Sequence, residues 1–162
     1  MHAPRRLTSQ MWAQYNATSY SYVFDIIPNG LTGAVGATHF QEVAFVFHNL
    51  NGEGYNNSVA VPPFENTPES YTQASTLISR MWISFIVDGD PNNSGGKLCS
   101  HACLRCFFLT VQIVSCVNWP AYTLDSPRNI VFNTNVTELA YVEPDIYRAE
   151  GIAYVSSNVL TL

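Results

Sequence analysis

The sequence contains few charged side chains, and few of those are basic. Only 12% of its 162 residues are charged, and 7 Lys and Arg stand against 12 Asp and Glu, which gives a formal net charge of −5. Proteins that bind nucleic acids need clustered Lys and Arg to neutralise phosphates. The only adjacent basic pair in the chain is Arg5-Arg6, so we expect no nucleic-acid partner.

Long apolar runs are also missing. The longest apolar stretch, residues 103–117, is interrupted by Arg105 and Gln112 and is shorter than the roughly 20 apolar residues that cross a bilayer. The first seven residues lack the apolar core of a signal peptide. We therefore expect no membrane span and identify no signal peptide.

The chain does contain enough apolar material for a folded core. Hydrophobic residues make up 47% of the sequence and aromatic residues 13%, a composition that excludes an intrinsically disordered protein. A length of 162 residues is that of one domain.

Apolar periodicity predicts two helices in the first ninety residues. The helix over residues 4–16 is indicated by four apolar residues at helical spacing, Leu7, Met11, Trp12 and Tyr15. A longer helix is expected to follow Thr67 as its cap, with Pro68 and Glu69 in its first turn, and to end at residues 88–91. Its predicted buried face consists of Tyr71, Ala74, Ile78, Met81, Trp82 and Phe85.

Strands are expected between and after these helices. Residues 20–27 alternate aromatic and aliphatic side chains and end in the turn signature of residues 28–30. Short strands are predicted at residues 130–132 and 139–142, and a last helix at residues 144–155. The apolar side of that helix would carry Ile146, Ala149, Ile152 and Val155. Alternating strands and helices predict an α/β fold.

The most informative stretch surrounds His39. Gly30, Gly33 and Gly36 precede it and allow a tightly turning loop. A short helix is expected after it, anchored by Val43, Phe45, Val46 and Phe47. Catalytic side chains are often presented at such loop-to-helix junctions, although a structural hydrogen bond is the commoner role for an arbitrary histidine. The polar residues 49–66 predict a surface loop.

The His39 stretch resembles the catalytic-histidine segment of the type-B carboxylesterases, the cholinesterase and fungal lipase branch of the α/β-hydrolases. The shared pattern is Gly36-x-x-His39-x-x-Glu42-x-x-Phe45-Val-Phe47. Other stretches are similar to parts of this family in the same order, namely Pro4-Arg5-Arg6, Tyr20 to Phe24, Trp82 to Asn92, Trp119 to Tyr122 and Glu143 to Gly151. The resemblance covers nearly the whole chain apart from residues 96–117.

The resemblance implies both a fold and a role for His39. The fold would be part of an α/β-hydrolase, its last sheet strands and packing helices, with residues 1–162 as the C-terminal part of one domain. His39 would be the general base and acid of a Ser–acid–His triad that cleaves carboxylic esters without a cofactor or metal. Glu42 would support the active site from behind, or equally would be a carboxylate facing a helix N-terminus.

One departure from the family pattern bears on activity. The sequence contains no Gly-x-Ser-x-Gly nucleophile elbow, and only 38 residues precede His39, although the family order is Ser, acid, His. We therefore expect the chain to be inactive alone and to need a separate N-terminal portion. The full-length parent would be an extracellular carboxylesterase or lipase of fungal type.

Asn-x-Ser/Thr sequons bear on whether the parent is a secreted glycoprotein. Four occur, at Asn16, Asn56, Asn92 and Asn135. About two would arise by chance in a chain of this composition, so the excess favours secretion and N-glycosylation only weakly.

All the cysteines of the chain lie in one short segment, at Cys99, Cys103, Cys106 and Cys116. Together with His101 they resemble a zinc ligand set, but paired Cys-x-x-Cys motifs are absent. Because residues 96–117 are the stretch without family resemblance, we interpret them first as an insert translated from a retained intron. Disulfide pairing within the segment is the second interpretation, and zinc is the third.

His2 and His48 have no partner pattern and are expected at the surface.

Two other functions compete with ester hydrolysis. A non-catalytic, esterase-like binding or adhesion module would share the fold, because fold does not fix function. A histidine retained in its full motif counts against that alternative. A small Cys/His metal-binding protein is the other alternative, and it depends on the cysteine segment.

Overall fold

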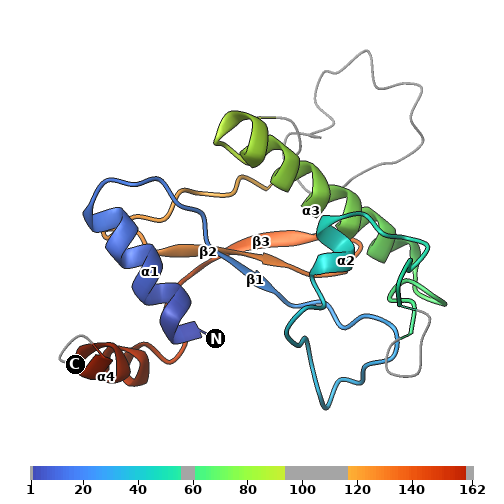
Figure 1. The fold of residues 1–162 in the computed structure, drawn as a ribbon, viewed down its shortest axis with the longest axis horizontal. Helices are drawn as coiled ribbons and strands as arrows, with labels where there is room; N and C mark the ends of the chain where they lie inside the picture. The colour runs from blue at the N-terminus through green and yellow to red at the C-terminus, as the bar shows by residue number, and fades with distance from the viewer. Residues whose placement is uncertain (1, 56–60, 94–116, 160–162) are drawn as a thin grey trace. The chain divides into compact units, whose positions relative to one another are not determined.

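The computed structural model describes residues 2–55, 61–93 and 117–159, and within them it contains four helices and three strands (Figure 1). In chain order these elements are α1 (His2–Gln14), β1 (Tyr22–Phe24), α2 (Val43–Val46), α3 (Glu69–Asp88), β2 (Arg128–Phe132), β3 (Ala140–Pro144) and α4 (Ala149–Val159). The predicted α/β fold class is confirmed. Among the described residues, no helix is both long enough and apolar enough to cross a membrane.

The three strands form one sheet in the order β1-β2-β3. The Ile130 N–H donates to the Ser21 carbonyl at 3.0 Å, and the Asp25 N–H donates to the Phe132 carbonyl at 2.9 Å. The register advances in the same direction along both strands, so β1 and β2 are parallel, and the connection between them carries α2 and α3. β2 and β3 are joined by residues 133–139 alone and form an antiparallel hairpin.

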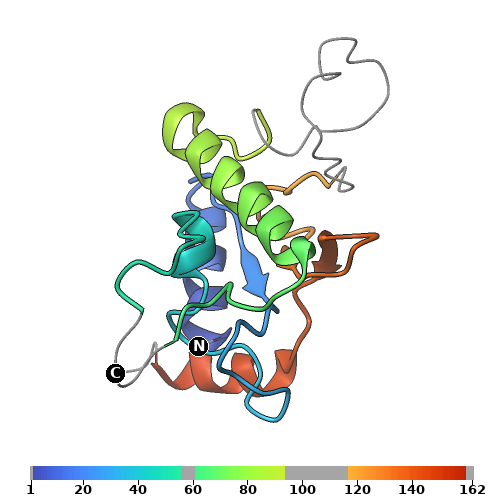
Figure 2. The ribbon, with the colours of Figure 1, turned by 90° about the vertical axis from the view of Figure 1, so that its right-hand side faces the viewer.

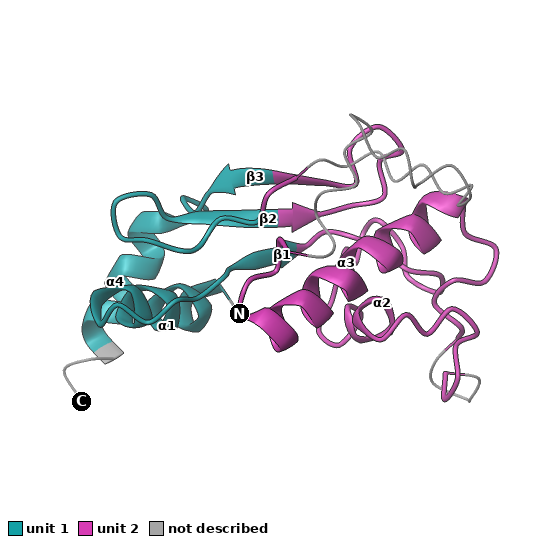
Figure 3. Ribbon diagram, turned by 90° about the horizontal axis from the view of Figure 1, so that it is seen from above, with its two compact units in different colours: residues 1–23, 119–130, 142–162 teal, residues 24–118, 131–141 magenta. Residues whose placement is uncertain are grey.

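The chain divides into two compact units (Figure 3). Unit 1 comprises residues 1–23, 119–130 and 142–162, and unit 2 comprises residues 24–118 and 131–141. In unit 1, α1 packs against α4; in unit 2, α2 packs against α3, and Figures 1 and 2 both show the latter pair side by side.

Unit 2 has an apolar core built on α3. This helix begins after Pro68, whose backbone is extended, and Glu69 in its first turn faces the positive end of the helix dipole. It ends at Asp88, because the next residue, Gly89, adopts φ +72° and donates its N–H to the Phe85 carbonyl at 2.8 Å. The buried apolar residues of unit 2 include Ile26, Ala44, Phe45, Ala74, Leu77, Ile78, Met81, Phe132 and Leu139.

The buried faces of two helices differ from the predicted ones. Among the apolar residues whose helical spacing predicted α1, Met11 is exposed by 44%, Trp12 by 51% and Tyr15 by 76%, and Leu7 is half-buried, whereas Arg6 and Ser9 are buried. On α3, Phe85 was expected to be buried but is 45% exposed. The buried face of this helix instead includes three serines, Ser70, Ser75 and Ser84. Arg6 and Ser75 are buried because their partners, Asp145 and the Phe45 carbonyl, lie far away in the sequence, where periodicity gives no signal.

Several predicted boundaries and anchors are wrong. Thr67 does not cap α3, because its hydroxyl donates to the Phe64 carbonyl at 2.8 Å instead. The last helix begins at Ala149 rather than Pro144, because β3 continues through Pro144. Ile146 therefore precedes this helix, and only Ile152 of the four residues predicted for its apolar side is buried. Phe47, predicted to anchor the short helix after His39, is 77% exposed.

Candidate active site

His39 lies on the turn that leads into α2. The Gln41 N–H donates to the Thr38 carbonyl at 3.4 Å, and the Val43 N–H donates to the Phe40 carbonyl at 3.3 Å, so the backbone turns twice within a few residues. Phe40 has a φ of +77°, a left-handed conformation that bulky side chains rarely adopt. Such strain persists only where the surrounding structure enforces it, and it is concentrated at functional sites.

The His39 side chain is exposed, as its position at a loop-to-helix junction predicts. Its ring lies 6.5 Å from the Phe40 ring, centroid to centroid, at an interplanar angle of 62°. No hydrogen bond to either ring nitrogen is found within the described part of the chain. The imidazole is therefore available to exchange a proton with a group that approaches from outside these residues.

Glu42 precedes α2 and is half-buried, and its side chain makes no capping hydrogen bond. Its charge acts on Tyr55: burial first, and the Glu42 carboxylate second, raise the pKa of the Tyr55 phenol. The described residues include no hydrogen bond between Glu42 and His39. Both interpretations of Glu42, a support for the active site and a partner of the helix dipole, remain predictions.

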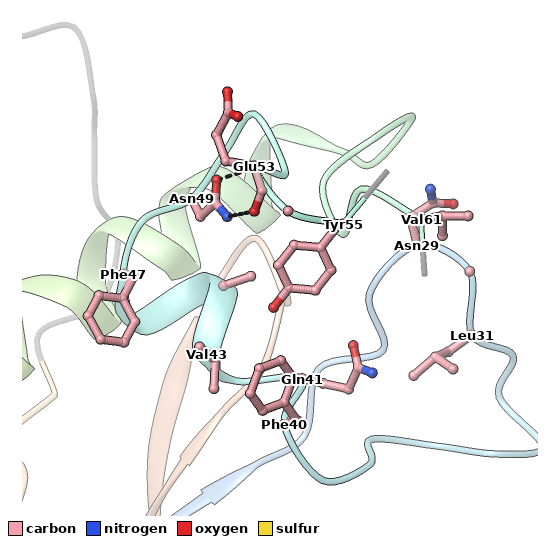
Figure 4. A pocket seen from close by; sticks show the side chains of 13 residues that line it. Asn29, Leu31, Phe40, Gln41, Val43, Phe47, Asn49, Glu53, Tyr55 and Val61 are labelled. Carbon is pink, nitrogen blue, oxygen red and sulfur yellow. Dashed lines mark hydrogen bonds between the residues drawn. The ribbon is translucent and has the colours of Figure 1, made fainter. Parts of the chain in front are cut away.

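A cavity of about 780 Å³ borders the His39 turn (Figure 4). Phe40 and Gln41, the two residues that follow His39, line it, whereas His39 itself does not. Most of the wall is apolar and comes from Leu31, Phe40, Val43, Ala44, Phe47 and Val61. The Tyr55 hydroxyl at this wall is buried and has no hydrogen-bond partner in the described residues.

His48 is exposed, as expected, but its ring also has a hydrogen-bond partner that the sequence did not indicate. Its Nδ1 lies 3.0 Å from the Ser75 Oγ, and the Ser75 hydroxyl lies 3.0 Å from the Phe45 carbonyl. Because the hydroxyl has one proton to donate to that carbonyl, it accepts a hydrogen bond from His48 Nδ1–H. Ser75 is completely buried, so this Ser–His pair joins α2 to α3 and does not present a nucleophile.

A second polar cluster, also unforeseen, lies in unit 1 around Asp145. Arg6 forms a bidentate pair with the carboxylate, from Nε to Oδ2 at 3.0 Å and from Nη2 to Oδ1 at 2.8 Å. Arg5 Nη2 donates to Oδ1 at 2.7 Å, Tyr122 OH to Oδ2 at 2.9 Å, and Asn129 Nδ2 to Oδ1 at 3.2 Å. The cluster connects α1 with the end of β3 and so holds the two ends of unit 1 together.

Two guanidinium groups share one carboxylate in this cluster. Burial alone would raise the pKa of Asp145, but hydrogen bonds from Arg6 and Arg5 hold that pKa well below its usual range. Burial, followed by the hydrogen bond to Asp145, raises the pKa of Tyr122 to about 12. The sequence signal was present in the tandem arginines and the aspartate of the Glu143-to-Gly151 stretch, but nothing indicated that they pair.

The structure describes three of the four predicted glycosylation sites and none of the predicted metal ligands. Asn16 and Asn135 are exposed, and Asn92 is half-buried with its amide donating to Asp90 Oδ1 at 2.7 Å. Asn56 lies outside the described residues. So do the four cysteines and His101, and the predicted insert at residues 96–117 except Val117. Within the described ranges, no three His, Cys, Asp or Glu side chains are grouped to hold a metal, and the zinc alternative stays untested.

Comparison with protein-family models and with curated protein sequences gave no match. Solved structures do match. A carboxylesterase of Geobacillus stearothermophilus, crystallised at pH 6.2, shares 27% identity at a TM-score of 0.57, covering 90% of this chain and 24% of that one. A PNB esterase shares 22% identity at a TM-score of 0.56, covering 88% of this chain and 22% of its own.

An esterase from the anaerobe Clostridium hathewayi, described as able to hydrolyse aliphatic aromatic polyesters, is also similar. It shares 19% identity at a TM-score of 0.62, covering 92% of this chain and 23% of its own. The fold of this chain is thus similar to that of one part of these esterases. The chain spans about a quarter of the length of the structures it matches.

Proposed function

We propose that this chain forms the histidine-bearing part of a carboxylic ester hydrolase, with His39 as the general base and acid. The observation that carries the proposal is the exposed imidazole on a strained turn, within a fold that matches a carboxylesterase at 27% identity. The sequence motif around His39 adds an independent reason, because it resembles the catalytic-histidine segment of type-B carboxylesterases.

The proposed reaction follows the serine hydrolase sequence. A serine Oγ attacks the ester carbonyl carbon while His39 accepts the Oγ proton, and the carbonyl oxygen becomes an oxyanion. Collapse of the tetrahedral intermediate expels the alcohol, which takes the proton from His39 and leaves an acyl-enzyme. Water then releases the acid in the same way. The sequence contains no Gly-x-Ser-x-Gly, so this proposal takes the serine from a separate portion and assigns the acid and the oxyanion donors to that same portion.

A secreted, glycosylated parent of fungal type belongs to the same proposal. Asn135 supports it locally, because the Thr137 hydroxyl donates to Asn135 Oδ1 at 2.9 Å on an exposed loop, so the sequon is accessible. Expression in a glycosylating host, followed by mass measurement before and after removal of N-glycans, would test this part. An unchanged mass would count against it.

The role of His39 is best tested in an assembled enzyme. We suggest a chimera in which this chain replaces the matched 24% of the Geobacillus stearothermophilus carboxylesterase, assayed with an activated aryl ester. His39→Ala should lower kcat by roughly 10⁴- to 10⁶-fold, as other triad knockouts do. The melting temperature should change little, because the exposed side chain makes no hydrogen bond within the described residues.

His48→Ala is the matched control, because it removes the other imidazole among the described residues of unit 2, whose Nδ1 is bonded to Ser75. We expect its kcat to stay within about tenfold of the parent, since this histidine has a structural partner. A loss of less than tenfold in His39→Ala, or an equal loss in both variants, would show that His39 is not the base.

A further inference from the structure

The cavity beside the His39 turn has the size of a small-molecule site. Its volume of about 780 Å³ lies within the range of roughly 300–1,000 Å³ that ligand pockets occupy. Its described wall belongs to unit 2 and comes from the turn at Gly30, from some of residues 40–47 and 49–55, and from Val61. Gly30 has φ +86°, and an added Cβ there would lie 2.3 Å from the Val61 side chain, so the wall needs glycine at this point.

One polar group at this cavity has no partner. The Tyr55 hydroxyl oxygen is buried without a hydrogen bond in the described residues, and Figure 4 shows it directed toward the side where Val43 and Phe40 lie. Burial first, and the Glu42 charge second, raise the pKa of this phenol, so it keeps its proton at neutral pH and can donate it. A buried donor without an acceptor is costly.

The other polar side chains of the wall do not supply that acceptor. Asn49 is held by two hydrogen bonds to the Glu53 backbone, at 3.0 and 2.9 Å, and Asn29 Nδ2 donates to the Pro62 carbonyl at 3.1 Å. Neither side chain bonds to the Tyr55 hydroxyl. The lining includes the acidic Glu53 and no Lys or Arg. An anionic ligand is therefore disfavoured, and a purely cationic one would bring no acceptor for Tyr55.

We propose that this cavity binds an uncharged, mainly apolar small molecule whose single carbonyl or ether oxygen accepts a hydrogen bond from the Tyr55 hydroxyl. The apolar body of the ligand would lie against the Phe40, Val43 and Leu31 side chains. The site is independent of the proposed hydrolysis, because its lining does not include His39.

The test compares two probes that share a carbon skeleton. Acetophenone carries one carbonyl acceptor, and ethylbenzene has none. The full 162-residue chain, fused to a soluble carrier, is titrated with each probe by calorimetry or saturation-transfer NMR. Acetophenone should bind one site, and Tyr55→Phe should weaken it about 2- to 13-fold, the range that one net hydrogen bond supplies. Ethylbenzene should bind Tyr55→Phe as well as it binds the parent chain.

Two controls complete the design. Tyr154→Phe removes a hydroxyl from an exposed tyrosine of unit 1 and should change neither affinity, and benzoate should bind more weakly than acetophenone because of its charge. Absence of saturable acetophenone binding would overturn the proposal. Equal effects of Tyr55→Phe on both probes would also overturn it, because the hydroxyl would then not be the recognising group. Neither result would depend on ester hydrolysis.

Discussion

Each unit of the molecule contains a buried tyrosine hydroxyl, and the two hydroxyls have opposite surroundings. In unit 1, the Tyr122 hydroxyl donates to Asp145, whose carboxylate also receives hydrogen bonds from two arginines and an asparagine. In unit 2, the Tyr55 hydroxyl has no partner among the described residues and lies at an apolar cavity. Saturated polar groups stabilise a fold, whereas an unsatisfied donor beside an open volume can still recognise a ligand.

The same contrast separates the charged and titratable side chains. Asp145 and Arg6 are buried in an ion-pair network, while His39 is exposed on a strained turn. We infer that the Asp145 cluster contributes stability and that the His39 turn contributes chemistry. Substitutions in the two regions should therefore affect different measurements, and the following predictions test that division.

The largest effect on stability is expected for Asp145→Asn. This variant leaves the Arg6 and Arg5 guanidinium groups without their anion, and removing one partner of a buried ion pair costs about 3–5 kcal/mol. Chemical denaturation of the chain, or of the chimera, measures the change. Asp125→Asn is the matched control, because Asp125 is exposed and should shift stability by less than about 0.5 kcal/mol. Equal small effects would show that the cluster is not stabilising.

A second expectation concerns acid. The pKa of Asp145 is depressed in the folded state, so its contribution is complete above the unfolded value of about 3.9 and is lost as pH falls below it. The difference in unfolding free energy between the parent and Asp145→Asn should therefore be largest above about pH 5 and shrink toward pH 3. A difference that stays constant across this range would contradict the assignment of the depressed pKa.

The smallest effects come from the two tyrosines, and they sharpen the comparison directly. Tyr122→Phe removes a hydrogen bond to a buried carboxylate and should cost about 1.5–3 kcal/mol. Tyr55→Phe removes a hydroxyl without a partner and should be neutral or slightly stabilising, because the buried donor no longer needs satisfaction. Thermal denaturation of both variants in the same buffer measures the pair. Similar losses in both would show that Tyr55 has a partner after all.

The elements with local signals were predicted well from the sequence. Helix α3 was expected to end at residues 88–91 and ends at Asp88, because Gly89 adopts the left-handed conformation that closes a helix. The His39 turn was expected from its glycines, and Gly30 and Gly36 indeed have positive φ values. At such positions one or two adjacent residues, here glycines, are enough to indicate the backbone conformation.

The buried polar groups could not be predicted, because their partners are distant in the sequence. Arg6 is buried because it pairs with Asp145, which lies 139 positions away. The side of α1 that carries Arg6 is therefore the buried one, and apolar residues such as Trp12 are exposed. Tyr55 lies in a stretch expected only to be a polar surface loop, and nothing in its neighbours indicates a buried hydroxyl. Periodicity reports which face is apolar, but it does not report which charged side chain finds a counter-ion.

The most direct test of the central claim compares the ester hydrolysis of the chain alone with that of the chimera. The account predicts that the isolated 162 residues hydrolyse an activated aryl ester no faster than a mock preparation. It also predicts that the folded chimera hydrolyses it in a manner that disappears in His39→Ala. Hydrolysis by the isolated chain that is lost in His39→Ala, or a folded chimera whose hydrolysis survives that substitution, would contradict the account.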